Sequence, residues 1–497
     1  MSVLGLDVGT STCKGIVLSA DGVILAEEQI SYADAVCIAG ASAEIPASCF
    51  TEHAAQVIRM LAARTKTDPI EAIAVSSHGE TLIPIGADGK TLTGAMLSMD
   101  RRCAKFSDAL VDTLGQDKIY SITGSMMHPQ FPVPKVMWLQ HMHPEIADKV
   151  AHYDTAEDHI YRMLGVPGMM DFSIASRFGG FDVQKRGWSK EILDAAWIKE
   201  ELFSKPVCGG TPLGYVPENI AKHLGLGNRV LVVAGGHDQP CAAIGMGIVE
   251  PGTVTVSAGS YECAALATER PLNDKRGMTY GLNSYCHVLP DQYITLAFFV
   301  SGMMAKWYLD TFCSEESRIA KNKGLSIYQY MENLSDGTPT GICVTPHIFG
   351  SMNPEWSEKN TAKISGLTAN TSKATLYQAV LEGTCCELDL NLRVLEKLNK
   401  PINRLLMTGG GTNSDRWMQM RADITTKPIE VVCNGVEASC LGAAILAGIG
   451  TKLFADVSDA NRRIKRNLKK YQPKNIDSYA DQKDAFQLLH RPGLLAD

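Results

Sequence analysis

The stretch VLGLDVGTST, residues 3–12, decides the fold class of this chain. An apolar run ends at Asp7, a turn of one glycine and three hydroxyl-bearing residues follows, and a second apolar run occupies residues 15–18. Two apolar runs joined by a short glycine-containing turn predict a pair of antiparallel strands. Asp21 and Gly22 then provide a tight hairpin turn into a third strand at residues 23–25.

A similar pattern returns in mid-chain. Residues 253–256 read TVTV, residues 258–260 read AGS, and a further apolar stretch runs through residues 263–266. Two halves that each open with a strand, a turn of glycine and hydroxyl residues, and another strand predict a duplicated domain.

Elsewhere, strands run into glycine turns that open helices. Residues 230–233 (VLVV) lead into GGHD at 235–238, and residues 405–407 lead into GGG at 409–411. Helices are expected at residues 415–424 and 438–447. This pattern is typical of α/β proteins, whose ligands bind beyond the carboxyl ends of the strands.

Composition excludes several classes of function. The 497 residues carry a net charge of −7 and are 45% hydrophobic, so no nucleic-acid or anionic-membrane partner is expected. The longest apolar stretch, residues 294–305, is too short to span a bilayer. Fourteen scattered cysteines without a CxxC pair, and no secretory signal at the N-terminus, predict reduced thiols in the cytoplasm. The basic run at residues 462–470 is interpreted as a solvated helix face.

The first turn has the chemistry of a phosphate site. Glycine lets the backbone approach an anion, the hydroxyls and a lysine add donors, and Asp7 can hold Mg²⁺ through water. The candidate phosphate contacts are Gly9, Thr10, Ser11, Thr12 and Lys14. The alternative is a simple hairpin, which uses the same residue types.

Asp238 is the acid–base candidate. It follows a strongly apolar strand and two glycines, so its carboxylate could project into a cleft and accept a hydroxyl proton. The alternative is a helix N-cap, a position that Asp also favours. The GGGTNS segment at 409–414 is similarly open to two interpretations, a ligand-binding helix start or a closely packed turn.

Taken together and in order, these segments resemble the FGGY carbohydrate kinase family of the actin, hexokinase and Hsp70 ATPase superfamily. Residues 7–11 resemble its first phosphate motif, and residues 235–239 resemble the segment that bears its catalytic base. Residues 252–260 resemble its second phosphate motif, and residues 409–413 with 437–444 its adenosine motif. Residues 134–139 and 366–368 resemble further family signatures.

The resemblance implies two actin-like (ribonuclease H-like) α/β domains flanking a deep catalytic cleft. Residues 1–247 would bind the sugar and carry the first phosphate motif, and residues 248–497 would bind ATP. It implies a small sugar or polyol as substrate, ATP with Mg²⁺ held by Asp7 and Asp238, and Asp238 as the catalytic base. It is also compatible with a homodimer. Besides the residues of the first turn, the implied ATP contacts are Gly259, Ser260, Gly409, Gly410, Gly411 and Asn413.

For the sugar, the resemblance is greatest to xylulokinases, and a ketopentose such as xylulose is the favoured substrate. The implied substrate contacts are His78, Gly79, Glu80, Asp100, His128, Asp238 and Gln239. Ser98 and Met99 depart from the family pattern, and Gly79 stands where glycerol kinases have an arginine, which predicts a larger pocket. Alternatives are a fuculose- or rhamnulose-type deoxyketose, glycerol or another polyol, gluconate, autoinducer-2, or a sugar-binding pseudokinase without catalysis.

Overall fold

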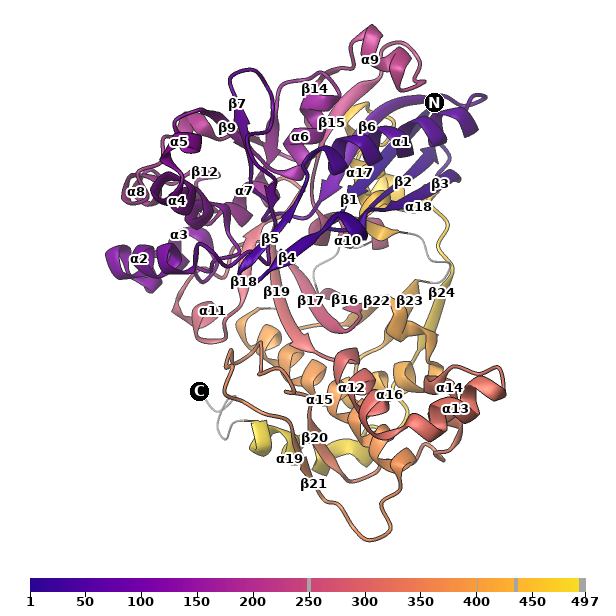
Figure 1. Ribbon diagram of the computed structural model, residues 1–497. Helices are drawn as coiled ribbons and strands as arrows, with labels where there is room; N and C mark the ends of the chain where they lie inside the picture. Colours follow the sequence, from indigo (N-terminus) through magenta and orange to yellow (C-terminus); the bar gives the residue numbers. More distant parts are fainter. Residues whose placement is uncertain (248–251, 400, 433–436, 491–497) are drawn as a thin grey trace.

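Two mixed β-sheets form the framework of the protein (Figure 1). The computed structural model describes residues 1–247, 252–399, 401–432 and 437–490. In the order β14-β15-β6-β1-β2-β3, the first sheet contains β14 (Pro212–Tyr215), β15 (Leu231–His237), β6 (Ile70–Ser77), β1 (Ser2–Val8), β2 (Thr12–Ser19) and β3 (Ile24–Ser31). In the order β18-β19-β17-β16-β22-β23-β24, the second contains β18 (Asn283–Cys286), β19 (Tyr293–Val300), β17 (Tyr261–Thr268), β16 (Thr253–Ala258), β22 (Arg404–Thr408), β23 (Ile429–Val432) and β24 (Leu468–Tyr471).

The two sheets share one pairing plan. In the first, β1 is antiparallel to β2 and parallel to β6, and β6 is parallel to β15. In the second, β16 is antiparallel to β17 and parallel to β22, and β22 is parallel to β23. The predicted duplication and the α/β class are therefore confirmed.

The N-terminal hairpin forms as the sequence predicts. Asp7 lies opposite Lys14 in the β1–β2 register, and Leu4, Leu6 and Val8 are fully buried. Helix α1 (Ser48–Arg64) packs over this face of the sheet. Burial on both sides explains the nearly continuous apolar run of β1.

A helix from the end of the chain covers the other face of the first sheet. Helix α17 (Ala438–Gly450) lies on β1, where a Cβ at Gly5 would stand 1.9 Å from the Cys440 carbonyl oxygen. It also crosses α10 (Asp238–Met246) at two glycines, since a Cβ at Gly245 or at Gly442 would lie 1.9 Å from a backbone oxygen of the other helix. The expected domain boundary falls between residues 247 and 248, and residues 248–251 lie outside the described part of the chain.

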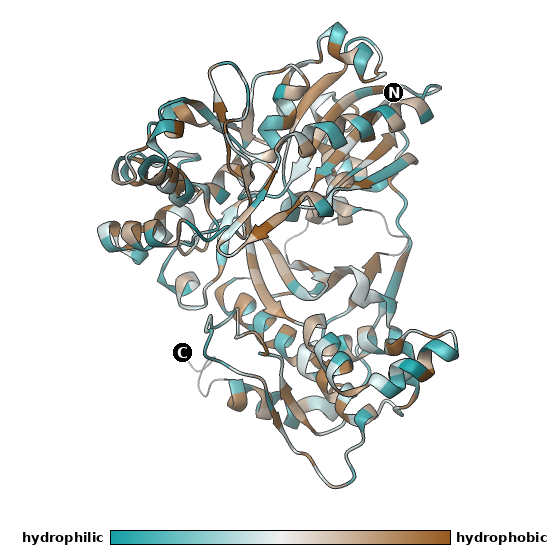
Figure 2. Cartoon of the chain, viewed as in Figure 1, coloured by the Kyte–Doolittle hydropathy of each residue, from teal (hydrophilic) through white to brown (hydrophobic). Residues whose placement is uncertain are grey.

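A group of helices between residues 104 and 195 extends the first half, including α2 (Ala104–Leu114), α3 (Gln116–Thr123), α4 (Pro132–Met142) and α8 (Lys190–Ala195). Their core is continuous with residues of β17–β19 in the second sheet. Helices α12 (Gly302–Phe312), α15 (Lys373–Leu398), α16 (Asp415–Thr425) and α19 (Ala480–His490) build the second half. Figure 2 shows several of the central strands largely in brown and the outer helices striped teal and brown, as expected of amphipathic helices on a core.

The helices expected at 415–424 and 438–447 are present as α16 and α17, which extends three residues further than predicted. The interpretation of residues 462–470 as one helix face is wrong. Helix α18 (Val457–Arg463) ends within this run, and β24 begins at Leu468. Arg466 donates to the Gly245 carbonyl, and Lys470 forms an ion pair with Glu430. The basic residues of the run are therefore distributed over two elements and the loop between them. In the described part of the chain, no helix is both long and apolar enough to cross a membrane.

Candidate active site

Three parallel strands of the first sheet bring the predicted residues of the first half together. In the register of β1, β6 and β15, Asp7 lies opposite Ser76, and Ser77 lies opposite His237. The residues that follow these strands, His78 and Asp238, therefore emerge at the same edge as Asp7. This is the edge at which α/β sheets bind ligands.

Asp7 is held by hydroxyl groups and is close to a second carboxylate. The Ser76 hydroxyl donates to Asp7 Oδ1 at 2.8 Å, and Ser439 at the start of α17 donates as well. Burial and then the negative charge of Asp238 raise the pKa of Asp7 to about 7. A carboxylate whose proton affinity is raised by a second carboxylate belongs to a site at which a divalent cation is favourable.

The first turn is open on one side and fixed on the other. The Gly9 amide donates to the Thr12 carbonyl at 3.0 Å, and the Tyr32 hydroxyl donates to the Gly9 carbonyl at 2.5 Å. Thr10, Ser11 and Thr12 are partly exposed. Lys14 points to α17, where its amine lies 2.9 Å from a Glu437 carboxylate oxygen.

Asp238 begins α10 and keeps one oxygen without a hydrogen-bond donor. Its Oδ1 is buried and unpartnered, with His237 Nε2 at 3.4 Å. The Tyr285 hydroxyl lies 2.9 Å from His237 Nδ1 and can donate to it, which would leave the Nε2 proton directed at Asp238. Burial and then Glu80 raise the pKa of Asp238 to about 6, so it is mostly ionised at neutral pH yet basic enough to accept a proton.

A buried ion pair forms the adjacent wall. Arg177, from a short 3₁₀ segment, donates from Nε at 2.8 Å and from Nη2 at 2.6 Å to the same oxygen of Glu80, Oε1. Burial would raise the pKa of Glu80, but the Arg177 guanidinium outweighs it and the pKa falls to about 2. Arg177 Nη1 is buried and has no partner. The pair therefore retains an unused donor.

The space beside Gly79 is filled. A Cβ at this position would stand 2.8 Å from Cβ and Cγ of Arg177 and 2.8 Å from Cδ2 of His237. The larger pocket expected from Gly79 stays a prediction. An arginine from a distant segment occupies the space that the missing side chain leaves.

The two predicted histidines differ in what they offer a ligand. His78 uses both ring nitrogens within the protein, Nδ1 with the Val8 carbonyl at 2.9 Å and Nε2 with the Thr81 hydroxyl. His128 Nδ1 accepts from the Gln130 amide at 3.3 Å, so its Nε2 carries the proton and can donate. Burial lowers the pKa of both, that of His128 to about 4, so both rings are neutral at pH 7.

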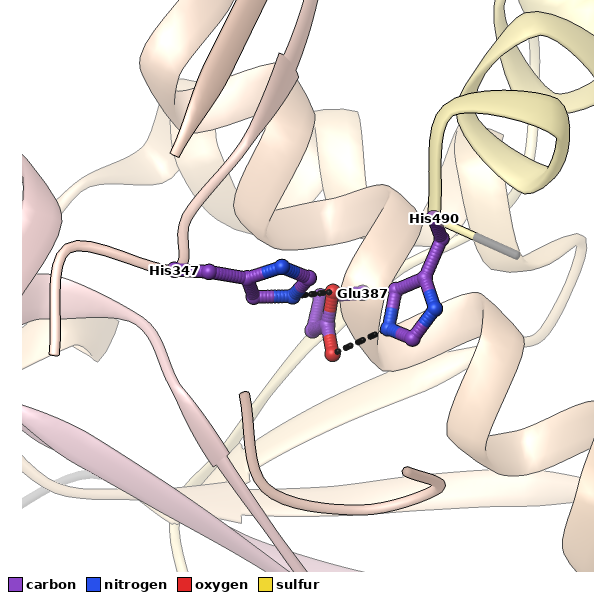
Figure 3. A group of neighbouring side chains, drawn as sticks. All are labelled: His347, Glu387 and His490. Carbon is purple, nitrogen blue, oxygen red and sulfur yellow. Dashed lines mark hydrogen bonds and ion pairs between the residues drawn. The ribbon is translucent and has the colours of Figure 1, made fainter. Parts of the chain in front are cut away.

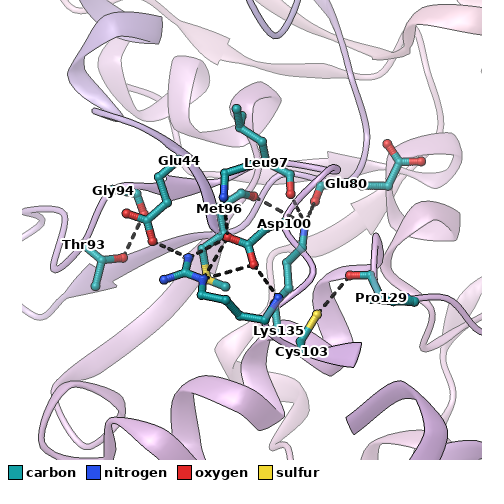
Figure 4. A network of polar contacts seen from close by, with 12 residues as sticks. Glu44, Glu80, Thr93, Gly94, Met96, Leu97, Asp100, Cys103, Pro129 and Lys135 are labelled. Atoms are coloured by element: carbon teal, nitrogen blue, oxygen red, sulfur yellow. Dashed lines mark hydrogen bonds and ion pairs between the residues drawn. The ribbon is translucent and has the colours of Figure 1, made fainter. Parts of the chain in front are cut away.

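Asp100 lies in a network behind the wall (Figure 4). Its carboxylate has no exposed surface and accepts from the Ala43 amide at 3.0 Å and from Arg102 at 2.7 Å. Lys135, also fully buried, donates to the carbonyls of Glu80 and Leu97, each at 2.7 Å. Burial lowers the pKa of Lys135 to about 8. Through Lys135, the network ties the backbone of Glu80 to that of Leu97.

The predicted residues of the second half gather at the edge of the second sheet. Ser257 lies opposite Thr408, so the Gly259–Ser260 turn and the glycine run at 409–411 follow neighbouring strands. A Cβ at Gly409 would stand 2.5 Å from the Ala258 carbonyl oxygen, which requires glycine there. The Gly302 amide donates to the Gly259 carbonyl at 3.0 Å. Gly259, Ser260, Gly410 and Asn413 are exposed.

Asp238 lies between the two halves. Its charge adds to burial in raising the pKa of Cys263 on β17, and Tyr285 of β18 contacts His237 next to it. The residues around Asp238 therefore come from both halves of the chain.

Family models for the FGGY family of carbohydrate kinases match in two parts, the N-terminal domain at residues 2–245 and the C-terminal domain at residues 254–451. The chain belongs to the FGGY family of carbohydrate kinases. It is 26% identical over 450 residues to a gluconokinase of Bacillus licheniformis, covering 89% of this chain and 86% of the relative. It is 29% identical over 462 residues to a xylulose kinase of Lactococcus lactis, covering 91% and 88%. The solved structure of ligand-bound xylulose kinase from Lactobacillus acidophilus superposes with a TM-score of 0.89 at 22% identity, covering 100% and 99%.

This FGGY kinase is an ATP-dependent phosphotransferase with a small-molecule sugar substrate, and its two-domain actin-like fold is confirmed. Sequence reasoning missed Arg177 and Tyr285, and quoted Lys135 only as part of a signature. One signal was available for Arg177, since it is the only charged residue in the apolar stretch 172–181. A lone charge in such a stretch predicts a buried ion pair with an unidentified partner.

Proposed function

We propose that this kinase transfers the γ-phosphoryl group of ATP to a hydroxyl of a neutral ketose, best a ketopentose such as xylulose, with Asp238 as the base. One observation carries this proposal. Asp238 Oδ1 is buried without a hydrogen-bond donor, and its charge acts on Arg177, whose Nη1 is a buried donor without a partner. An unpaired buried acceptor and an unpaired buried donor at one site are the groups that a substrate hydroxyl would satisfy.

In the proposed step, Asp238 takes the proton of the sugar hydroxyl. The oxygen of that hydroxyl attacks the γ-phosphorus of ATP, and ADP leaves. The His237 ring, with Nε2 3.4 Å from Asp238 Oδ1, would lie beside the carboxylate, and Arg177 Nη1, Glu80, His128 and Gln239 would bind the other hydroxyls. We infer that His78 shapes the pocket wall through its hydrogen bonds with Val8 and Thr81. Asp100 would do the same through its hydrogen bond with the Ala43 amide. Because Gly79 has no side chain, it would allow Arg177 and His237 to approach its backbone closely.

The residues at the two strand edges fit MgATP. Asp7 and Asp238 would hold Mg²⁺, Asp7 through water, because carboxylates and water are the ligands that this ion prefers. The bound ion would neutralise charge on the phosphates during transfer. The first and second turns would bind phosphates by backbone amides and hydroxyls, and residues 409–413 would contact the adenosine. Lys14, paired with Glu437, would link the first turn to α17.

The charges near Asp238 favour a neutral substrate over an aldonate. Arg177 is already neutralised by Glu80, and the lowered pKa values of His78, His128 and His237 leave these rings uncharged. The ionised carboxylate of Asp238 then gives the site a net negative charge, which would repel the carboxylate of gluconate. Gluconate is nevertheless the second candidate, because a relative of similar identity is named gluconokinase.

A coupled ADP-release assay over a panel of sugars tests the proposal. The panel contains xylulose, a fuculose- or rhamnulose-type deoxyketose, glycerol, gluconate and autoinducer-2, each with MgATP. We expect kcat/KM for the best neutral ketose to exceed that for gluconate and for glycerol by at least ~10-fold, about 1.4 kcal/mol. A preference for gluconate would overturn the charge argument. No sugar-stimulated turnover at all would indicate a sugar-binding protein without catalysis.

We also propose a cytoplasmic location. Thirteen cysteines are free thiols in the described part of the chain, and Cys433 lies outside it. A homodimer remains a proposal on family grounds, which sedimentation would test.

A further inference from the structure

Two histidines and a glutamate converge in the second domain, apart from the catalytic edge (Figure 3). Glu387 projects from the middle of α15, His347 follows β20 (Cys343–Thr345), and His490 is the last residue of α19. His347 Nε2 lies 3.2 Å from Glu387 Oε2, and His490 Nε2 lies 3.5 Å from Glu387 Oε1. All three potential ligand atoms lie within 4.8 Å of one another.

The cluster is buried and incompletely satisfied. The side chains of Glu387 and His490 are 1% and 0% exposed, and that of His347 is 4% exposed. Glu387 Oε1 and both ring nitrogens of His490 lack a hydrogen-bond partner. Unpaired polar atoms in a dry interior are costly, and here they belong to three residue types that all ligate metals.

We propose that His347, Glu387 and His490 form a binding site for a divalent transition-metal ion, zinc by the chemistry of its donors. At Zn–N and Zn–O distances of about 2.0–2.1 Å, the ligand atoms of a tetrahedral site are about 3.3 Å apart. His347 Nε2 lies 3.2 Å from Glu387 Oε2, and His490 Nε2 lies 3.5 Å from the other oxygen, Oε1. Since one ligand atom from each residue lies within 4.8 Å of the others, a contraction of at most about 1.5 Å would give tetrahedral spacing.

The donor set selects the class of metal. Two imidazoles and one carboxylate suit zinc and its first-row neighbours, whereas Mg²⁺ prefers oxygen ligands alone. Metal binding at this site is therefore separable from the Mg²⁺ expected with ATP.

The position of the site indicates a structural role. The three ligands come from three segments, and α19 is also held to the domain by contacts that include the Gln482 amide, which donates to the Ile342 carbonyl at 2.8 Å, and the Lys483–Asp389 ion pair at 3.1 Å. A metal at His490 would add a link at the end of the same helix. No substrate-sized opening is needed for this role, which agrees with the burial of the ligands.

Metal analysis and thermal unfolding of the full chain test the site. Chelator-treated protein is mixed with Zn²⁺, freed of excess by gel filtration and assayed for bound metal, with Mg²⁺ as the comparison ion. We expect about one zinc per chain. We also expect an unfolding midpoint at least about 5 °C higher with Zn²⁺ at 100 times Kd than without it. Mg²⁺ should give neither effect.

Glu387→Gln and His347→Gln should each lower zinc affinity at least ~10-fold and reduce the midpoint shift. Lys483→Met is the matched control, because it weakens the docking of α19 without removing a ligand and should leave zinc stoichiometry unchanged. Bound zinc well below one per chain in wild type would overturn the proposal. So would equal zinc binding by wild type, Glu387→Gln and His347→Gln, which would place the ion elsewhere.

Discussion

Each domain buries one arginine–glutamate pair beside its strand ends, and the two pairs differ in what they leave unused. In the first, Arg177 donates from two nitrogens to one oxygen of Glu80, and Nη1 has no hydrogen-bond partner. In the second, Arg421 of α16 reaches both oxygens of Glu262 on β17, and the Ser301 hydroxyl donates to the same carboxylate at 2.6 Å.

In the second pair, both carboxylate oxygens are held by the guanidinium. Arg421 and Glu262 have no exposed surface, and the guanidinium lies 4.4 Å over the Trp417 ring. This pair joins the strand after the Gly259–Ser260 turn to the helix after the glycine run, so it holds two backbone segments together. Each arginine keeps one buried nitrogen without a hydrogen-bond partner, Nη1 in Arg177 and Nε in Arg421. The difference teaches that a pair whose free donor is a terminal nitrogen, and whose carboxylate keeps one oxygen outside the ion pair, is a candidate for ligand binding, whereas a pair with both carboxylate oxygens held is a candidate for stability.

The largest expected effect concerns the base that the first pair flanks. Asp238→Asn should lower kcat by ~10²–10⁴-fold, the usual contribution of a positioned general base. Because the amide keeps the shape of the carboxylate, the KM values for sugar and ATP should change far less. Steady-state kinetics measure both. A variant within threefold of wild type would remove Asp238 from this role.

Breaking the second pair should cost stability. Arg421→Met leaves Glu262 charged, buried and unpaired, and should lower the unfolding free energy of the second domain by about 3–5 kcal/mol. The double variant Arg421→Met/Glu262→Gln should recover most of the loss. Urea unfolding followed by Trp fluorescence measures this, and the sugar KM should stay within about twofold. A single variant as stable as wild type would contradict the structural role of the pair.

Altering the first pair should affect sugar more than stability. Arg177→Lys keeps a cation beside Glu80 but loses the forked donor and Nη1, so kcat/KM for the sugar should fall ~10–100-fold, about 1.4–2.7 kcal/mol. The KM for ATP should change by less than about twofold. Arg276→Met, which removes an exposed arginine paired with Asp274, is the matched control. Wild-type sugar kinetics in Arg177→Lys would show that Nη1 does not contact substrate.

The smallest effect is in the pH profile. A base must be ionised to accept a proton, so activity is lost as the pH falls through the pKa of Asp238, about 6. Protonation of Asp7, whose pKa is about 7, should cause a first loss of activity at higher pH. Glu80 stays ionised over the whole range, because its pKa is about 2. Between pH 8 and 5, kcat/KM should therefore decline in two steps, and the residual activity of Asp238→Asn should retain only the upper one. A two-step decline in the variant would assign the lower step to another group.

Much of the fold could be predicted from local patterns. Apolar runs ending in glycine turns placed β1, β2, β15, β16 and β22, and α16 began where the sequence indicated. The hydroxyl and glycine motifs in their order indicated the family, because each motif is a continuous stretch whose chemistry can be read from neighbouring residues.

The sequence by itself determined several central strands, the duplicated plan, the family and the acidic residues at the strand ends. Only the tertiary structure decided that Arg177, 97 positions from Glu80, fills the space beside Gly79, and that α17 covers the first sheet. It also decided that residues 347, 387 and 490 meet. Periodicity and turn chemistry report on residues a few positions apart, whereas these contacts join segments tens to hundreds of positions apart whose meeting depends on how whole domains pack.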